Sequence, residues 1–119
     1  MRVTIRITKA FKIRAKPLLK KYNSLSSDLE KLHNQLLITP HLGVSVGKNL
    51  YKIRLKISSK AKGKSGGARV ISFIETTIIG YAEQISTEEI IVNLVSIYDK
   101  SEVSNISDKE LKDLLKNLK

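Results

Sequence analysis

The sequence contains no cysteine and no tryptophan, and it has only two prolines and six glycines among 119 residues. The absence of cysteine excludes disulfide bonds and thiolate zinc sites, and it is compatible with a reducing compartment. No apolar run reaches the length of a transmembrane helix. Residues 1–16 alternate with Arg and Lys and lack the continuous apolar segment of a signal peptide. We therefore expect a cytoplasmic protein.

Acidic residues are scarce in the first half of the chain. Residues 1–69 contain 17 Lys and Arg against 2 Asp and Glu, whereas residues 70–119 contain 5 Lys and 9 acids, for a net charge of +11. A basic half of this kind attracts polyanions, with nucleic acid first and anionic membrane second, or an acidic protein partner. The simpler alternative is a solvated surface that keeps the protein soluble.

Length and apolar content indicate one folded domain over residues 1–119. The chain is 41% hydrophobic and has clear periodic segments, which argues against disorder. A chain of this length can bury a modest single core. No internal repeat or low-complexity tract divides it.

The most informative stretch is residues 49–74, which predicts a β-hairpin with a basic face and a basic tip. Residues 50–57 alternate strictly, which is typical of a half-buried strand. One face of this strand is apolar, and the other carries Lys52, Arg54 and Lys56. The turn adds Lys60, Lys62 and Lys64, and Arg69 lies near the start of the second arm, residues 68–74.

The rest of the chain predicts one further strand and two helices before this hairpin. Residues 2–8 alternate as a short strand, and Thr8 can cap a helix over residues 9–22. Pro17 should kink that helix or divide it into two pieces. The S-x-x-E spacing of Ser27 and Glu30 predicts a capping box for a second helix that ends near residue 39. Residues 40–43 then form a turn.

After the hairpin, residues 80–88 are expected to form a connection and residues 90–98 a buried strand. Ser107 and Glu110 form a second capping box, which predicts an amphipathic helix over residues 107–118. The predicted fold is α+β, with a helical hairpin packed on a mainly antiparallel four-stranded sheet. The expected order is strand, helix, helix, three strands and a final helix.

The residues do not support metal-dependent catalysis or nucleotide hydrolysis. His33 and His41 are eight positions apart and lack neighbouring acidic ligands, so no metal site is expected. The glycine-rich turn lacks the spacing of a nucleotide-binding loop and precedes a strand instead of a helix. No cofactor is expected.

Chemistry carried out by cations remains possible. RNA can be cleaved by its own 2′-hydroxyl if that group is deprotonated, the phosphorane charge is stabilised and the leaving 5′-oxygen is protonated. Arg and Lys stabilise the charge directly. A lysine crowded by other cations has its charged form disfavoured and can exchange protons. Phosphate binding without catalysis needs the same residues, so the sequence itself leaves both interpretations open.

The run YKIRLKISSKAKGKSGGARVI, together with LVSIYDKSEVSNISDKEL downstream, resembles the RelE/ParE superfamily of bacterial toxins, closest to its HigB-like RelE members. The resemblance implies a small α+β fold related to microbial ribonucleases. It implies a toxin of a type II toxin–antitoxin system that cleaves mRNA in the ribosomal A site without metal. The stretch from residue 75 to residue 89 is longer than the connection usual in the family.

The resemblance also implies roles for individual residues. Arg69 would stabilise the phosphorane, Lys56 or Arg54 would handle a proton or stabilise charge, and Lys100 would contact the phosphate or the leaving oxygen. Tyr98 would stack on a base, with a core aromatic as the alternative. Contacts to RNA backbone are implied for Lys52, Lys60, Lys62 and Lys64.

The implied partners are the ribosome, mRNA and a cognate antitoxin. The antitoxin would use an acidic segment that covers the basic face or displaces the C-terminal helix. Two alternatives stay open at this point: a ParE-like toxin that inhibits gyrase by protein binding, and a non-catalytic basic RNA-binding module.

Overall fold

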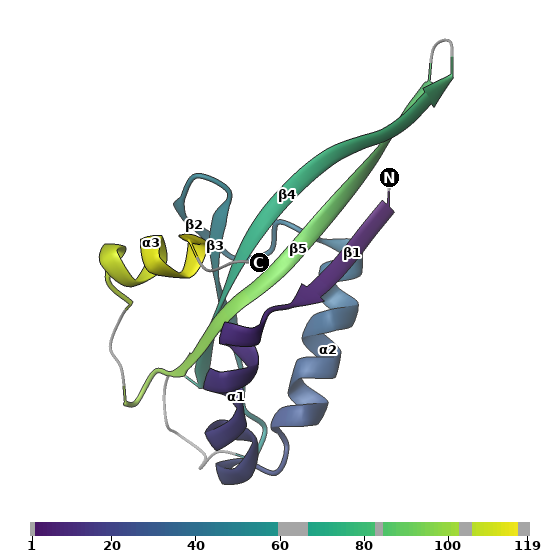
Figure 1. Cartoon of the computed structure of the whole chain (residues 1–119). Coiled ribbons are helices and arrows are strands. Elements are labelled where there is room, and N and C mark those ends of the chain that lie inside the picture. The colour runs from purple at the N-terminus through teal and green to yellow at the C-terminus, as the bar shows by residue number, and fades with distance from the viewer. Residues whose placement is uncertain (1, 60–66, 83–84, 103–105, 117–119) are drawn as a thin grey trace.

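The computed structural model describes residues 2–59, 67–82, 85–102 and 106–116 (Figure 1). The elements follow in the order β1 (Arg2–Ile7), α1 (Lys9–Lys21), α2 (Leu25–Ile38), β2 (Val44–Gly47), β3 (Leu50–Leu55), β4 (Ala68–Ala82), β5 (Ile85–Asp99) and α3 (Asp108–Lys116). Within this part of the chain, no helix is long and apolar enough to cross a lipid bilayer.

One sheet joins all five strands in the order β1-β5-β4-β3-β2. The β1 and β5 strands pair in parallel, and the other three pairs are antiparallel. The α+β class and the antiparallel run from β3 to β5 are therefore confirmed, whereas the prediction of four strands is wrong. The additional strand is β2, whose four residues offer too few alternating positions to stand out in the sequence.

The sheet is covered on both faces. The helical hairpin of α1 and α2 packs on one face, where its side chains and those of the strands form the larger apolar cluster. The smaller cluster lies on the opposite face and includes Leu111 and partly buried Leu114 and Leu115 of α3. Figure 1 shows α3 lying across the sheet near β2 and β3, away from α1 and α2. The predicted helical hairpin is confirmed, and α3 supplies a third layer.

The first helix begins as predicted but is not divided. The Thr8 hydroxyl accepts a hydrogen bond from the Phe11 amide at 3.2 Å, which caps α1. Pro17 lies inside one continuous helix, so of the two predicted alternatives, a kink or a division, the division into two pieces is wrong. Pro17 cannot donate to the carbonyl of Ile13, but this part of α1 is exposed and water can take the place of the missing donor.

The capping boxes of the other two helices have different outcomes. Ser107 caps α3 as predicted, because its hydroxyl accepts from the Glu110 amide at 3.1 Å and donates to the Glu110 carboxylate at 3.1 Å. The box at Ser27 is wrong, since α2 begins at Leu25 and Ser24 precedes it. Asp28 instead accepts hydrogen bonds from Ser24, which precedes α2, and from Ser58, which follows β3.

The predicted connection over residues 80–88 is also wrong. Strands β4 and β5 continue to Ala82 and Ile85, which pair directly. The register shifts between Ile78 and Gly80, and an irregularity at a glycine is how a strand pair tolerates a residue that weakens regular pairing. The two strands project beyond the rest of the sheet as a long hairpin (Figure 1).

Candidate functional site

The predicted site residues gather at one end of the sheet through strand register. Arg54 on β3 lies opposite Arg69 on β4, and Arg69 lies opposite Tyr98 on β5. Directly opposed residues on antiparallel strands have Cβ atoms about 5 Å apart. Three side chains from three neighbouring strands therefore form one rung across the sheet.

Lys56 and Lys100 lie close to this rung, just beyond the ends of β3 and β5. Leu55 pairs with Ala68, so Lys56 follows beside Gly67. On the other side, the Lys100 amide donates to the Gly67 carbonyl at 2.9 Å. We call Lys52, Arg54, Lys56, Arg69 and Lys100 the basic sheet end.

Gly67 is required for this arrangement. Its φ of +55° lies in the left-handed region, and a Cβ at this position would collide with the backbone carbonyl oxygen of Leu55. The glycine thus lets the start of β4 lie close against the end of β3 while its carbonyl binds the Lys100 amide. Of the glycines in the predicted basic turn, Gly67 is the one that the structure describes.

The basic residues belong to the face of the sheet opposite the helical hairpin. Leu55 and Ile57 are buried in the cluster beneath α1 and α2, and the exposed Lys56 lies between them in the chain. Tyr98, which shares a rung with Arg69, belongs to the cluster beneath α3. Alternation along the strands therefore places Arg54, Lys56 and Arg69 on the α3 face.

The members of the site differ in exposure. Arg54 and Lys56 are exposed, and Lys52 and Lys100 are half-buried. Arg69 is only 8% exposed, and its Nη1 donates to the Ala68 carbonyl at 3.1 Å. Burial of the arginine holds its guanidinium in place, which suits a fixed positive charge more than a mobile surface contact.

Tyr98 is 7% exposed and lies beneath α3, in one cluster with Leu111. Burial raises the pKa of its phenol, and the positive charge of Arg69 opposes that shift. The hydroxyl makes no hydrogen bond of normal geometry to the described residues, although the Ile106 amide is near enough to favour the charged form slightly. In this arrangement the ring is a core aromatic, and a base reaches it only if α3 moves.

Several predicted residues are not brought into the site or cannot be placed. Lys60, Lys62 and Lys64 lie outside the described residues. His33 is exposed on α2, and His41 contacts the Tyr51 ring edge-on, with 5.6 Å between ring centroids. Among the described residues, no group of three or more His, Cys, Asp and Glu could hold a metal ion.

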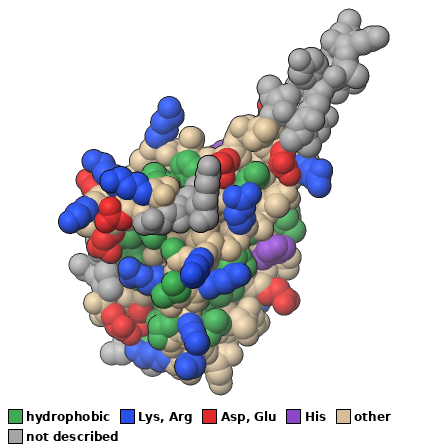
Figure 2. Space-filling view, viewed as in Figure 1, with side chains coloured by type: hydrophobic (Ala, Val, Ile, Leu, Met, Phe, Trp, Pro, Cys, Tyr) green, Lys and Arg blue, Asp and Glu red, His purple; other side chains and the backbone are tan. Residues whose placement is uncertain are grey.

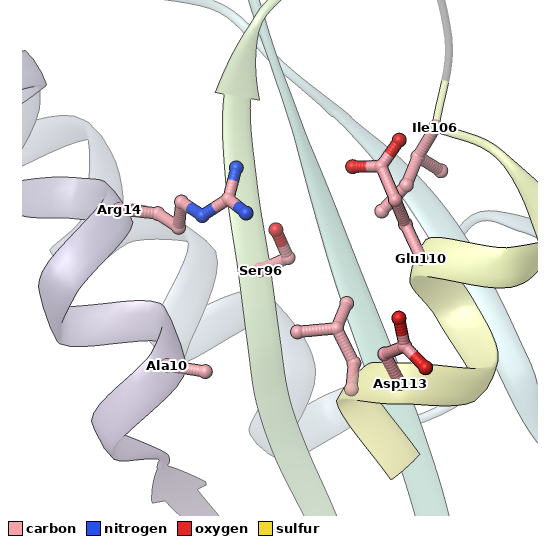
Figure 3. A pocket seen from close by; sticks show the side chains of 7 residues that line it. Ala10, Arg14, Ser96, Ile106, Glu110 and Asp113 are labelled. Atoms are coloured by element: carbon pink, nitrogen blue, oxygen red, sulfur yellow. The ribbon is translucent and has the colours of Figure 1, made fainter. Parts of the chain in front are cut away.

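A pocket of about 240 Å³ lies beside the edge of β5, between α1 and α3 (Figure 3). Arg14 extends from α1 toward Ser96 on β5, and Glu110 and Asp113 lie on the α3 side. A second pocket further along this edge is also lined by Arg14, together with Lys21 and Glu102, which form an ion pair at 2.8 Å. Sequence patterns could not indicate either pocket, because the lining residues come from elements that only the tertiary fold brings together.

Asp28 is a structurally important residue that lies between Ser27 and Glu30 of the predicted capping box. It is buried, and its carboxylate accepts from the Ser58 amide at 3.0 Å, the Ser58 hydroxyl at 2.6 Å and the Ser24 hydroxyl at 2.8 Å. Burial alone would raise the pKa of this carboxyl, but the hydrogen bonds outweigh burial and lower the pKa. The contact fixes the segment that directly follows Lys56 and Ile57.

Comparison of the chain with protein-family models, with curated proteins and with solved structures gives no match.

Proposed function

We propose that this protein is the toxin of a type II toxin–antitoxin system and cleaves mRNA in the ribosomal A site through attack by the 2′-hydroxyl, without metal. The proposal includes a RelE-like fold related to microbial ribonucleases and action in the cytoplasm, where ribosomes are found. The sequence resemblance suggests this activity. The observation that carries it is the rung of Arg54, Arg69 and Tyr98, with Lys56 and Lys100 beside it.

The geometry of the basic sheet end suits a single phosphodiester. In the proposed reaction, a bond forms between the 2′-oxygen and phosphorus, and the bond between phosphorus and the 5′-oxygen breaks. The products are a 2′,3′-cyclic phosphate and a 5′-hydroxyl. Two negative oxygens on the phosphorane require fixed positive charge, which the buried Arg69 and its neighbour Arg54 are placed to supply.

Proton transfer is assigned to the lysines at the strand ends. The amine of Lys56 takes the proton of the 2′-hydroxyl, Arg54 stabilises the charge that develops, and the ammonium of Lys100 donates a proton to the leaving 5′-oxygen. Lys56 and Lys100 flank the backbone of Gly67 from its two sides, so they can approach one phosphate from opposite directions. General acid–base groups contribute about 10²- to 10⁴-fold each when positioned in this way.

Because α3 covers Tyr98, the backbone and the base of the substrate reach the site in a definite order. Since Leu111 and Tyr98 share one cluster, a base that stacks on Tyr98 needs α3 to move aside. The exposed Arg54 and Lys56 are reachable without that movement. Binding of the backbone therefore precedes stacking in the proposed sequence of events. A cognate antitoxin with an acidic segment would cover the basic sheet end or displace α3.

One alternative function gives the buried Arg69 a structural role only. A module that only binds RNA backbone could use the exposed Arg54 and Lys56 and leave Arg69 to a structural role on β4. Loss of Arg69 would then weaken RNA binding little. Gyrase inhibition by protein binding is the other rival, and it predicts gyrase-dependent DNA breaks.

Primer extension on a translated mRNA with purified ribosomes tests the proposal. We expect codon-phased cuts without added metal, with a cyclic phosphate on the upstream product and a 5′-hydroxyl on the downstream product. Arg69→Ala should remove the cuts, and Lys31→Ala, an exposed lysine on α2, should leave them unchanged. Uncut mRNA with tight RNA binding would support the binding module, and DNA breakage in the presence of gyrase would support the gyrase inhibitor.

A further inference from the structure

The outward face of α1 carries a second concentration of positive charge. Lys9, Lys12, Lys16 and Lys20, called here the lysine stripe, are exposed and follow one another at intervals of three or four residues. Helical periodicity places them on the side opposite the buried residues of α1. Figure 2 shows Lys and Arg side chains over the lower front of the molecule, where α1 lies in Figure 1.

This arrangement works against the stability of the helix. Lys9 and Lys12 stand in the first turn, which has no acidic residue, although the positive end of the helix dipole favours acids there. Lys12, Lys16 and Lys20 are four residues apart in succession, and like charges at that spacing repel. In the described part of the chain, none of the four ammonium groups has a hydrogen-bond or ion-pair partner. Residues that lower the stability of a helix without a compensating contact are typical of a functional surface.

The chemistry of the face indicates a polyanion with a regular backbone. Lysine is depleted in protein–protein interfaces, which prefer aromatic residues and arginine. The outward face of α1 has no aromatic side chain on which an unpaired base could stack, as single-stranded nucleic acid requires. Two apolar residues of α1 are exposed beside the lysines, Ile13 at 61% and Leu19 at 41%. From Lys9 to Lys20 the stripe is about 16 Å long, enough to meet several phosphates of a duplex.

We propose that the lysine stripe binds the phosphate backbone of double-helical RNA at a site separate from the basic sheet end. The α1 helix packs on one face of the sheet, and the basic sheet end belongs to the other face. One strand bound at the basic sheet end therefore does not also run along α1. If the proposed nuclease function holds, the stripe anchors the protein on structured RNA while the basic sheet end takes a single strand.

Binding to an RNA duplex of about 16 base pairs, measured by fluorescence anisotropy at several salt concentrations, tests this proposal without any cleavage step. The variant replaces Lys9, Lys12, Lys16 and Lys20 with Gln. Each lost phosphate contact should lower the slope of log K against log salt by about 0.9, so the slope should fall by about 3 to 4. Replacement of the same four residues with Arg keeps the positive charge and should keep the wild-type slope, while circular dichroism of the Gln variant checks that the helix still folds.

A matched control replaces four exposed lysines elsewhere, Lys31, Lys48, Lys109 and Lys116, with Gln and so removes the same net charge. We expect its slope to change by less than about 1. Equal slopes for the two variants would overturn the proposal, because binding would then follow net charge alone. Unchanged duplex binding together with lost binding of a poly-glutamate peptide would also overturn it, in favour of an acidic protein partner.

Discussion

The two basic surfaces of this protein are built in different ways. The basic sheet end combines residues from three strands and the chain after β5, and cross-strand register makes their side chains converge. The lysine stripe comes from one helix, and its side chains stand in a line along an exposed face. Convergent charge can surround one phosphate, whereas charge in a line can follow a backbone. The difference fits the chemistry proposed for the first surface and the affinity proposed for the second.

Both surfaces have an energetic cost. Arg54 stands directly opposite Arg69, and like charges opposed across strands destabilise a sheet by up to about 1 kcal/mol. Like-charged lysines four apart destabilise a helix by about 0.2–0.5 kcal/mol for each pair. Neither arrangement is explained by stability of the fold. Each therefore makes more sense as a surface for an anionic partner.

Substitution of Arg69 should affect the two surfaces most differently: cleavage at the basic sheet end should fall, and duplex binding at the lysine stripe should not. Loss of one preorganised positive group from a phosphorane site typically costs about 10²- to 10³-fold in rate. If the proposed nuclease function holds, Arg69→Ala should reduce mRNA cleavage by that factor and relieve the growth arrest that we expect from expression without antitoxin. Duplex RNA binding through α1 should stay within about twofold, since Arg69 lies on the other face of the sheet. Growth arrest that survives Arg69→Ala combined with Lys100→Ala would contradict the catalytic assignment.

Substitution of Lys56 should have the next largest effect. Lys56→Ala should lower the cleavage rate by about 10- to 100-fold, because the group is exposed and water can replace part of a proton-transfer role. Its neighbour in sequence, Ile57, stays buried, so the fold should be unchanged. Cleavage rates measured across pH check the role, since a proton-transfer group alters the shape of the profile and a binding group lowers it uniformly.

The basic face of β3 was predictable from sequence, but the burial of Arg69 and Tyr98 was not. Alternation over residues 50–57 correctly placed Arg54 and Lys56 opposite the apolar face, because period-2 patterning needs only local information. The burial of Arg69 and Tyr98 depends on where α3 packs, and an amphipathic helix does not specify which face of a sheet it covers. The role of Asp28 could not be predicted for a similar reason, because its partner Ser58 lies 30 residues away in the chain.

The residue that positions Lys56 gives a test of stability. Asp28→Ala removes a buried charged acceptor from Ser24 and Ser58 and should lower the free energy of unfolding by about 3 kcal/mol. Cleavage should fall with it under destabilising conditions, while Lys31→Ala on the same helix should change stability by less than about 0.5 kcal/mol. Urea titration with circular dichroism provides the measurement.

The same residue predicts a pH dependence. The pKa of Asp28 is lower in the folded protein than in the unfolded chain, so its contribution to stability is present above the unfolded value and is lost as pH falls through the folded value. Wild-type stability should therefore drop below about pH 4 by more than that of Asp28→Ala. Parallel pH profiles of the two proteins would contradict the assigned hydrogen bonds.

Removal of the Tyr98 hydroxyl should have the smallest effect. Since that buried hydroxyl lacks a hydrogen bond of normal geometry to the described residues, Tyr98→Phe should change the unfolding free energy by less than about 1 kcal/mol. Cleavage should stay within about threefold of wild type if the ring acts by stacking. Tyr98→Leu keeps an apolar side chain and removes the aromatic face, so it should lower cleavage more than Tyr98→Phe does.

A double-mutant cycle on the cleavage rate tests most directly whether Arg54 and Arg69 act on the same phosphate. Residues that act as a unit give effects far from additive. We therefore expect Arg54→Ala and Arg69→Ala together to reduce the rate about as much as Arg69→Ala alone, while Lys12→Ala combined with Arg69→Ala multiplies the separate effects. Effects of Arg54 and Arg69 that simply multiply would show that their side chains do not converge on one phosphodiester.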